Sequence, residues 1–213
     1  MPTTVPYLQK PLHLVYSILF LIFWVYTACT TPDLTNWITE NTLTLSFLII
    51  LVAFYNIFRL SDTSYTLIFL FLLLHVYGSQ YQYAENPLGE WLQQTGNLQR
   101  NHYDRLVHFT FGLLLAYPMY EVLVYALKVK PLWSYLLVVQ TTLALAALYE
   151  LVEWVVADLI YGGNQQAMDY LGMQGDIWDA QKDMALALLG ATLAMETTYL
   201  LYRFSKRQAT FNR

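Results

Sequence analysis

Residues 175–190 read GDIWDAQKDMALALLG, and they join three carboxylates to the start of a long apolar segment. Asp176, Asp179 and Asp183 recur at intervals of three and four residues, so a helix would place them on one face. The apolar segment continues to residue 202 and is followed by a basic tail. The pattern predicts a membrane-spanning helix that carries its acids at the end where it enters the bilayer.

The composition of the whole chain is that of a membrane protein. Of its 213 residues, 57% are hydrophobic and only 12% are charged, whereas a soluble domain carries about 25% charged residues. The single cysteine, Cys29, has no partner for an internal disulfide. A net charge of -4, with no basic patch outside the termini, argues against a nucleic-acid partner.

Six apolar segments predict an all-α, polytopic membrane protein with six transmembrane helices in one domain, residues 1–213. The expected spans are residues 12–28, 43–58, 65–79, 105–127, 132–156 and 177–202. Small residues recur along the fourth and sixth spans, at Gly112, Ala116, Ala187, Gly190 and Ala194. Because small side chains let membrane helices approach closely, these two spans are expected to pack against each other.

The basic residues predict the orientation of the chain. Most of them lie at the two termini and in the second and fourth connections: Lys10, Arg59, Lys128, Lys130, Arg203, Lys206, Arg207 and Arg213. The positive-inside rule therefore places both termini in the cytoplasm. Four tryptophans fall near the opposite boundary, as an aromatic belt would require: Trp37, Trp91, Trp154 and Trp178.

Acids and imidazoles gather at the outer ends of the last three spans. Each span contributes a pair at helical spacing: Asp104 with His108, Glu150 with Glu153, and Asp179 with Asp183. At about 1.5 Å per helical residue, all three pairs are expected roughly 5–10 Å below the outer boundary. We therefore predict that six titratable groups converge at one depth.

Three interpretations of this convergence remain open. The acids would form structural ion pairs, with Arg105 and Lys182 as counterions. Alternatively the six groups would bind a divalent cation (Mn, Fe, Zn or Mg), with His75 and Asp176 as further candidate ligands. The third interpretation is a pathway for protons or cations without a fixed metal.

The leading hypothesis is a metal-assisted site, open to the outer leaflet, that acts on a lipid or lipid-linked substrate through a bound water. Arg105 or Lys182 would then meet an anionic headgroup. The alternatives are a proton- or cation-coupled transporter and a non-catalytic envelope protein. No phosphate-binding loop, nucleophile elbow or HExxH motif occurs in the sequence. The sequence therefore leaves open whether the protein is an enzyme.

Four segments together resemble the YjdF family of bacterial inner-membrane proteins: HVYGSQYQYAENPLG, NHYDRLVHFTFGLLLAYP, YELVEW and YLGMQGDIWDAQKDM. The resemblance covers nearly the whole chain and implies a multi-pass protein of the inner membrane, but no reaction. A weaker likeness extends to VanZ-like proteins, whose first polar element matches at Asp104 and His108. Glu153 stands where those proteins have Gln and Asp183 where they have Asn, so this site is the more acidic one.

Overall fold

The computed structural model describes residues 7–58 and 60–211, without the side chains of residues 8, 165, 166, 169 and 207–211. Arg59 and Arg213, which entered the prediction of orientation, lie outside the described residues, as does the side chain of Arg207. Within the described part the chain is helical and has no strand, which confirms the predicted all-α class.

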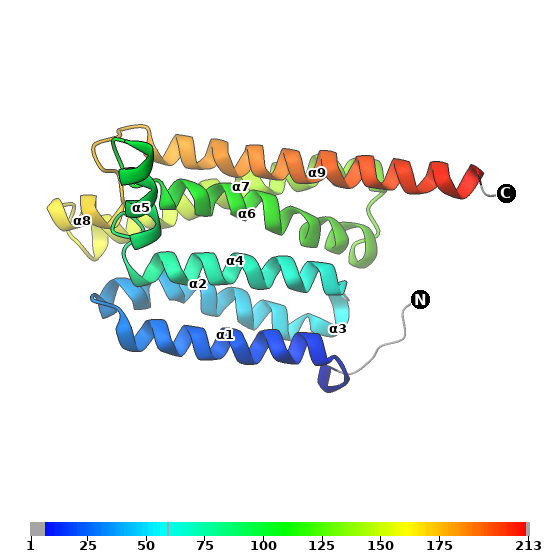
Figure 1. Cartoon of the computed structure of the whole chain (residues 1–213), viewed down its shortest axis with the longest axis horizontal. Coiled ribbons are helices and arrows are strands. Elements are labelled where there is room, and N and C mark those ends of the chain that lie inside the picture. The colour runs from blue at the N-terminus through cyan, green and yellow to red at the C-terminus, as the bar shows by residue number, and fades with distance from the viewer. Residues whose placement is uncertain (1–6, 59, 212–213) are drawn as a thin grey trace.

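Six long helices run side by side and form the body of the protein (Figure 1): α1 Pro11–Thr30, α2 Leu34–Ala53, α4 Asp62–Gln80, α6 Tyr103–Glu121, α7 Pro131–Leu159 and α9 Asp179–Phe211. Shorter elements join them, namely a 3-10 turn at Tyr7–Gln9, α3 Tyr55–Phe58, α5 Pro87–Gly96, a π-helical turn at Val122–Ala126 and α8 Gln165–Tyr170. Helices α1 and α2 pack against α4, helices α6, α7 and α9 pack against one another, and α4 packs against α6. The protein therefore consists of two three-helix groups that meet where α4 contacts α6.

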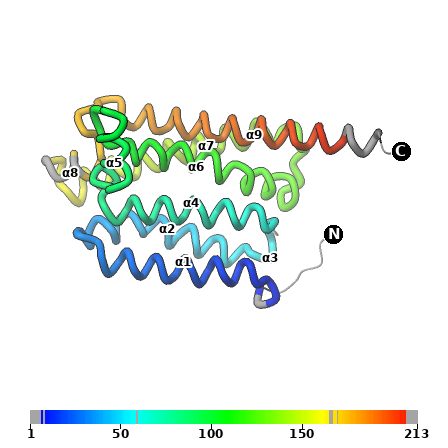
Figure 2. Tube along the Cα trace, viewed as in Figure 1, coloured from blue at the N-terminus to red at the C-terminus, as the bar shows by residue number. Residues whose placement is uncertain are grey.

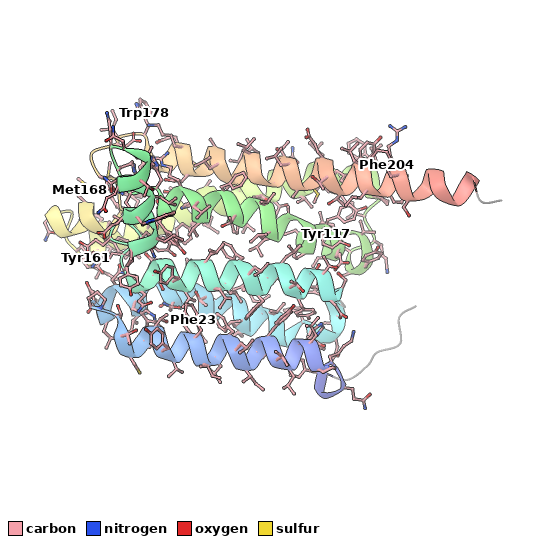
Figure 3. All side chains as sticks on the ribbon, in the orientation of Figure 1. Phe23, Tyr117, Tyr161, Met168, Trp178 and Phe204 are labelled. Atoms are coloured by element: carbon pink, nitrogen blue, oxygen red, sulfur yellow. The ribbon has the colours of Figure 1, made fainter. Side chains whose placement is uncertain are left out.

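The two ends of this bundle differ. Helices α5 and α8 lie at one end, here named the loop end, where Trp178 is also found (Figures 1 and 3). The start of α1 and the part of α9 around Phe204 lie at the other end, here named the terminal end (Figures 2 and 3). Both ends of the described chain are thus on the same side of the bundle, as an even number of crossings requires.

Five helical segments are long and apolar enough to cross a membrane: α1, α2, the segment Tyr103–Ala126, α7 and residues Asp179–Lys206 of α9. Helix α4 is not among them because its two ends are polar. It is the helix of its group that contacts α6, and its side chains Ser64, His75, Ser79 and Gln80 are buried. The predicted count of six spans therefore stays a prediction, although α4 runs alongside the other five (Figure 1).

Helix α2 begins at Leu34, well before the predicted start of the second span at residue 43. Its first turns are polar, which is why the apolar pattern predicts a connection there. These polar side chains are buried against α4: the Asn36 side chain donates to the carbonyl of Ser79 at 3.3 Å, and the Asn41 side chain donates to its hydroxyl at 3.0 Å. The backbone N–H of Asn36 donates to the carboxylate of Asp33, which caps the helix. The polar half of α2 is therefore helical because the bundle satisfies its side chains.

The remaining spans differ from their predicted limits mainly at the ends. Helix α4 begins at Asp62, capped by Ser61, and α7 continues to Leu159. Helix α9 begins at Asp179 and continues as far as Phe211, well past the expected end at residue 202. The fourth span divides into α6 and a π-helical turn, which follows Pro118 inside α6.

Helices α6 and α9 approach so closely that their glycines allow no side chain. A Cβ added to Gly112 would overlap the carbonyl oxygen of Ala187 and lie 2.7 Å from the nitrogen of Ala191. A Cβ added to Gly190 would lie 2.7 Å from the nitrogen of Leu113. The predicted close packing of these two spans is confirmed, and it brings the polar residues of the two helices together at the loop end.

Candidate functional site

The titratable residues predicted to converge do meet at the loop end, but they divide into two groups. The first group is an ion-pair network around Asp176 and Asp179, at the start of α9. The second is a deeper cluster of acids and imidazoles on α6, α7 and α9. The division follows depth along α9, because Asp183 lies one turn farther into the bundle than Asp179.

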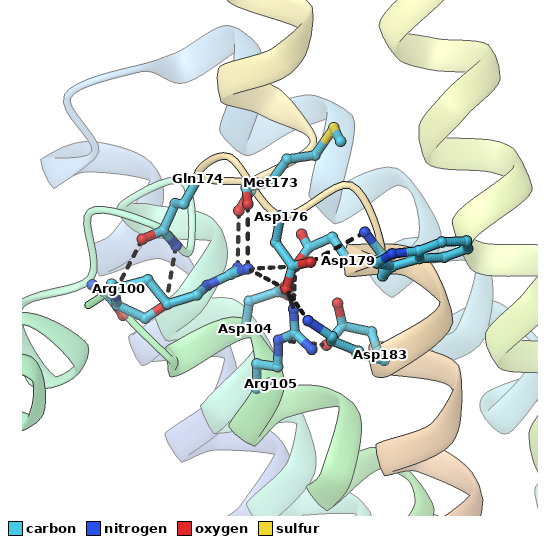
Figure 4. Close-up of polar contacts among 12 residues, drawn as sticks. Arg100, Asp104, Arg105, Met173, Gln174, Asp176, Asp179 and Asp183 are labelled. Carbon is cyan, nitrogen blue, oxygen red and sulfur yellow. Dashed lines mark hydrogen bonds and ion pairs between the residues drawn. The ribbon is translucent and has the colours of Figure 1, made fainter. Parts of the chain in front are cut away.

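Two arginines hold the first group together (Figure 4). Arg100 Nη1 lies 2.6 Å from Asp179 Oδ1, and the same guanidinium donates to the backbone carbonyls of residues 172–173 at 3.1 and 3.2 Å. Arg105 Nη2 donates to Asp179 Oδ1 and, at 3.0 Å, to Asp176 Oδ2. The side chains of Asp179, Arg100 and Arg105 are only 6%, 10% and 11% exposed. Asp179 is thus a buried carboxylate whose charge is balanced by two guanidinium groups.

Lys182 completes this network at its exposed side. Its Nζ lies 2.6 Å from Asp176 Oδ2, and its side chain is 53% exposed. Hydrogen bonds from Lys182 and from the backbone N–H of Trp178 lower the pKa of Asp176. Asp176 is therefore held as a carboxylate by its partners. The predicted counterions, Arg105 and Lys182, both form ion pairs here.

Arg100 is a partner that sequence reasoning missed. It precedes α6 in the third connection, and its distance along the chain from Asp179 gives no signal that the two will meet. The contact depends on the loop before α6, where the Gln174 side chain accepts from the backbone N–H of Asn101 at 2.9 Å and donates to its carbonyl at 3.0 Å. These two bonds fix Arg100 beside the loop that leads into α9 (Figure 4).

The second group has ligand atoms close enough to share one ion. One atom each from Asp104, His108 and Asp183 lie within 4.8 Å of one another. His108 Nε2 is 3.5 Å from Asp104 Oδ1 and 3.6 Å from Glu150 Oε1. Carboxylate and imidazole groups in this number are the ligands that Mn, Fe or Zn would use. Of the six predicted ligands, three form the compact set and Glu150 lies beside His108. Glu153 lines the same polar cavity without belonging to the set, and Asp179 belongs to the arginine network.

Two carboxylate oxygens of this group are buried without a hydrogen bond from any described residue: Asp183 Oδ1 and Glu150 Oε1. The nearest cationic atom to Asp183 Oδ1 is Arg105 Nε, at 3.6 Å, which is an ion-pair distance but not a hydrogen bond. Asp183 is also only 2% exposed. A buried carboxylate oxygen without a hydrogen-bond donor is energetically costly. Both atoms have unused lone pairs with which to accept a proton or coordinate a cation.

A ring of further polar residues borders this group on the side of α2 and α4. The hydroxyl of Tyr149 donates to Glu40 Oε2 at 2.9 Å, and that of Tyr83 lies 2.6 Å from His75 Nδ1. Burial raises the pKa of Tyr83, so its hydroxyl keeps its proton. Since His75 Nδ1 is engaged by Tyr83, this nitrogen of the predicted further ligand is not available to a metal.

Glu40 is a functional candidate that sequence reasoning missed. It lies in the part of α2 that the apolar pattern predicts to be a connection, where an acid carries no signal for a site. A signal was available in its neighbours, because Asn36, Glu40, Asn41 and Thr44 recur at helical spacing along one face. All four are buried in the structure.

Two cavities meet at Asp104. A polar cavity of about 430 Å³ lies among α6, α7 and α9 and is lined by five carboxylates: Asp104, Glu150, Glu153, Asp179 and Asp183. The second cavity, of about 300 Å³, lies among α2, α4, α6 and α7. Its loop end is polar, with His75, Tyr83, Asp104, His108 and Tyr149, and the rest of its lining is apolar. Asp104 therefore lines both the polar cavity and the second cavity, which is named the apolar groove from here on.

Comparison with known proteins gives one family and one curated relative. The profile of a family described as predicted membrane protein (DUF2238) matches residues 12–206. The inner membrane protein YjdF of Escherichia coli (strain K12) is 41% identical over 201 residues, which cover 93% of this chain and 93% of that protein. No solved structure matches the chain. The resemblance to the YjdF family is confirmed, whereas these matches give no support to the likeness with VanZ-like proteins.

Proposed function

This chain belongs to the DUF2238 family of predicted membrane proteins and is a multi-pass protein of the bacterial inner membrane, and we propose that it binds a divalent cation and acts on a lipid or lipid-linked substrate. The cation would be held by Asp104, His108 and Asp183, with Glu150 beside them. A cation there would polarise a substrate oxygen and lower the pKa of a bound water.

One observation carries this proposal: Asp104 belongs to the compact ligand set and also lines the apolar groove. A substrate whose apolar part occupies the groove would therefore present its polar part to the ligand set. Sites that combine an apolar pocket with a few convergent polar groups are typical of ligand binding.

The charge balance also favours a cation. The polar cavity is lined by five carboxylates, and the guanidinium groups of Arg100 and Arg105 contact two of them, Asp179 and Asp183. Fully ionised, the set would keep a surplus of three negative charges. Like charges at such short range cannot all persist, so protons or a cation must neutralise part of the cluster. A divalent ion at Asp104, His108 and Asp183 would do so.

The orientation expected from the basic residues gives the site its access. With both termini in the cytoplasm, the loop end faces the periplasm and the outer leaflet. Lys182 is the better placed of the two predicted headgroup contacts, because it is largely exposed whereas Arg105 is engaged with Asp176 and Asp179. An anionic headgroup would thus approach beside Lys182.

A coupled transporter is supported less well, because the polar lining of the groove is confined to its loop end. Toward the terminal end the groove is lined by apolar side chains such as Phe111, Leu115 and Met119. Among the described residues that line it, none in this half offers a relay for a proton or an ion. The polar lining of the groove therefore fits a reaction at one face better than a path through the groove.

Metal analysis of the purified protein tests the proposal. Protein kept in detergent without chelator is expected to carry about one divalent ion per chain, and Asp183→Asn and Asp104→Asn should lose it while remaining folded. Glu90→Gln, which changes an exposed acid on α5, is the matched control and should retain the ion. Added Mn²⁺ or Zn²⁺ should raise the melting temperature of the stripped wild type but not of Asp183→Asn. A folded wild type that neither retains a divalent ion nor responds to one would refute the proposal.

A further inference from the structure

We propose that α5 lies in the surface of the bilayer at the loop end, with Leu88, Trp91 and Leu92 inserted between the headgroups and the hydrocarbon of that leaflet. The inference is independent of the proposed cation site. Three features of α5 carry it: its direction relative to the spans, the arrangement of its side chains around the helix, and the buried amides that fix its position.

Helix α5 runs across the direction of the long helices. Figure 1 shows it at the loop end, crosswise to α4 and α6, the two long helices that it connects. Five helical segments of the described bundle are long and apolar enough to cross a membrane, so their common direction is that of the membrane normal. A helix that crosses this direction at the end of the spans lies in the plane of the membrane surface, as interfacial helices do.

Leu88, Trp91 and Leu92 form an apolar face on α5. At 3.6 residues per turn, these three positions fall within about 100° of one another around the helix. Their side chains are exposed, by 39%, 59% and 37% in that order. Tryptophan is typical of membrane interfaces, because its ring contacts hydrocarbon while its N–H stays among the headgroups. A contiguous exposed face of this kind marks a contact surface.

The other sides of α5 face the protein and the water. Gly89 is buried, and a Cβ added to it would overlap the side chain of Asn101, so this side packs directly on the loop before α6. Glu90 and Gln94 are exposed and lie one turn apart on the remaining side. The helix therefore has a protein side, a polar side and an apolar face in three directions. Such a helix fits a position where protein, water and lipid meet.

Buried amide groups hold α5 in this orientation. The Asn86 side chain caps the helix by accepting from the backbone N–H of Leu88 at 3.0 Å, and it donates to the carbonyl of Tyr77 on α4 at 3.1 Å. The Asn101 side chain donates to the carbonyl of Asn86 at 3.0 Å. Both asparagine side chains are almost fully buried. The bundle thus presents the apolar face in a fixed direction, and α5 needs no basic residues of its own to reach the lipid.

Lipid fits the apolar face better than a protein partner does. Three side chains of one short helix are too few for the ~800 Å² that a standard protein interface buries on each partner. The one charged residue of α5, Glu90, lies away from this face. The spans already place α5 at the bilayer surface, so lipid reaches the face without a separate association step.

Site-directed spin labelling of the full chain in proteoliposomes tests the placement. The sequence has one cysteine, Cys29, so a Cys29→Ser background accepts a nitroxide at one chosen position. Leu88→Cys and Leu92→Cys report on the apolar face, and Gln94→Cys is the matched control on the polar side of the same helix. Ile22→Cys, at a 62% exposed position of the candidate span α1, is the reference for lipid.

Two relaxing agents separate lipid from water, because oxygen concentrates in the bilayer and a water-soluble nickel complex does not. The ratio of oxygen to nickel collisions should be several-fold higher at Leu88 and Leu92 than at Gln94, and it should approach the ratio at Ile22. All four side chains are exposed, so the substitutions should leave folding intact.

Two results would overturn the proposal. If the nickel complex reaches the apolar face as readily as it reaches Gln94, the face lies in water. If neither agent reaches Leu88 and Leu92, protein covers the face, either a second copy of the chain or another partner, and the assignment to lipid is wrong. Neither result depends on the metal content of the protein.

Discussion

Asp179 and Asp183 lie one turn apart on α9, and we expect conversion to asparagine to cost much more stability at Asp179 than at Asp183. Asp179 accepts hydrogen bonds from Arg100 and Arg105, and all three side chains are largely buried. The substitution Asp179→Asn would leave two buried guanidinium groups without the carboxylate that balances them. Removing one partner from a buried ion pair costs about 3–5 kcal/mol, which corresponds to a fall in melting temperature of roughly 6–20 °C for a chain of this size.

Asp183 has no such hydrogen bonds. Its Oδ1 accepts none from the described residues, and it lies in the compact set with Asp104 and His108. Neutralising it relieves repulsion among carboxylates and removes only the ion pair with Arg105 at 3.6 Å. Without metal we therefore expect Asp183→Asn to change the stability by less than about 1 kcal/mol or to raise it.

Melting curves of the two variants in detergent, with chelator present, decide the matter. Asp176→Asn serves as the control in the same network. Its loss should be smaller than that of Asp179→Asn, because Lys182 is exposed and Arg105 would keep its contact with Asp179. The reasoning is refuted if Asp183→Asn loses as much stability as Asp179→Asn. Such a result would mean that the deeper acids are also needed for folding, and that the division between the two groups is wrong.

Two further predictions concern the bundle. Gly112→Leu should abolish folding and membrane accumulation, because even a Cβ at this position would overlap the carbonyl of Ala187. The control is Leu98→Ala, at an exposed loop position, which should be tolerated. A normal yield of Gly112→Leu would contradict the observed α6–α9 contact. The basic residues predict the orientation, so reporter fusions after Lys130 and at the C-terminus should report the cytoplasm. A tag inserted near Asn97 should report the periplasm. A periplasmic C-terminus would instead place the polar cluster on the cytoplasmic side.

Much of the bundle is predictable from the sequence because the bilayer imposes simple limits on it. Long apolar segments must be helical in lipid, so five of the expected spans correspond to helices able to cross a membrane. The packing of α6 on α9 also follows from local residues, since Gly112 and Gly190 mark the place where two backbones meet. Both inferences rest on properties of single helices.

The errors arise where one helix is completed by another. The first turns of α2 are too polar for lipid, and they are helical because Asn36 and Asn41 find partners at Ser79 on α4. The spacing of residues along the chain does not show that Asn36 and Asn41 will meet Ser79. The same holds for Arg100, whose place beside Asp179 depends on the loop bonds of Gln174 and not on any helical period. The convergence of acids was predictable from depth, but their division into balanced and unbalanced carboxylates required the positions of the arginines.

That division bears on what the site can do. The carboxylate of Asp179 contacts two guanidinium groups, and it therefore holds the start of α9 against the loop before α6. The carboxylates of Asp104, Glu150 and Asp183 have no comparable hydrogen bonds from guanidinium groups, and one oxygen each of Glu150 and Asp183 is buried without a hydrogen bond from any described residue. Buried acids without fixed counterions are expensive in a membrane protein and are typical of functional positions. The residues that we propose to respond to a ligand lie on three helices, at Asp104 on α6, Glu150 on α7 and Asp183 on α9, and the arginine network holds the start of α9 beside them.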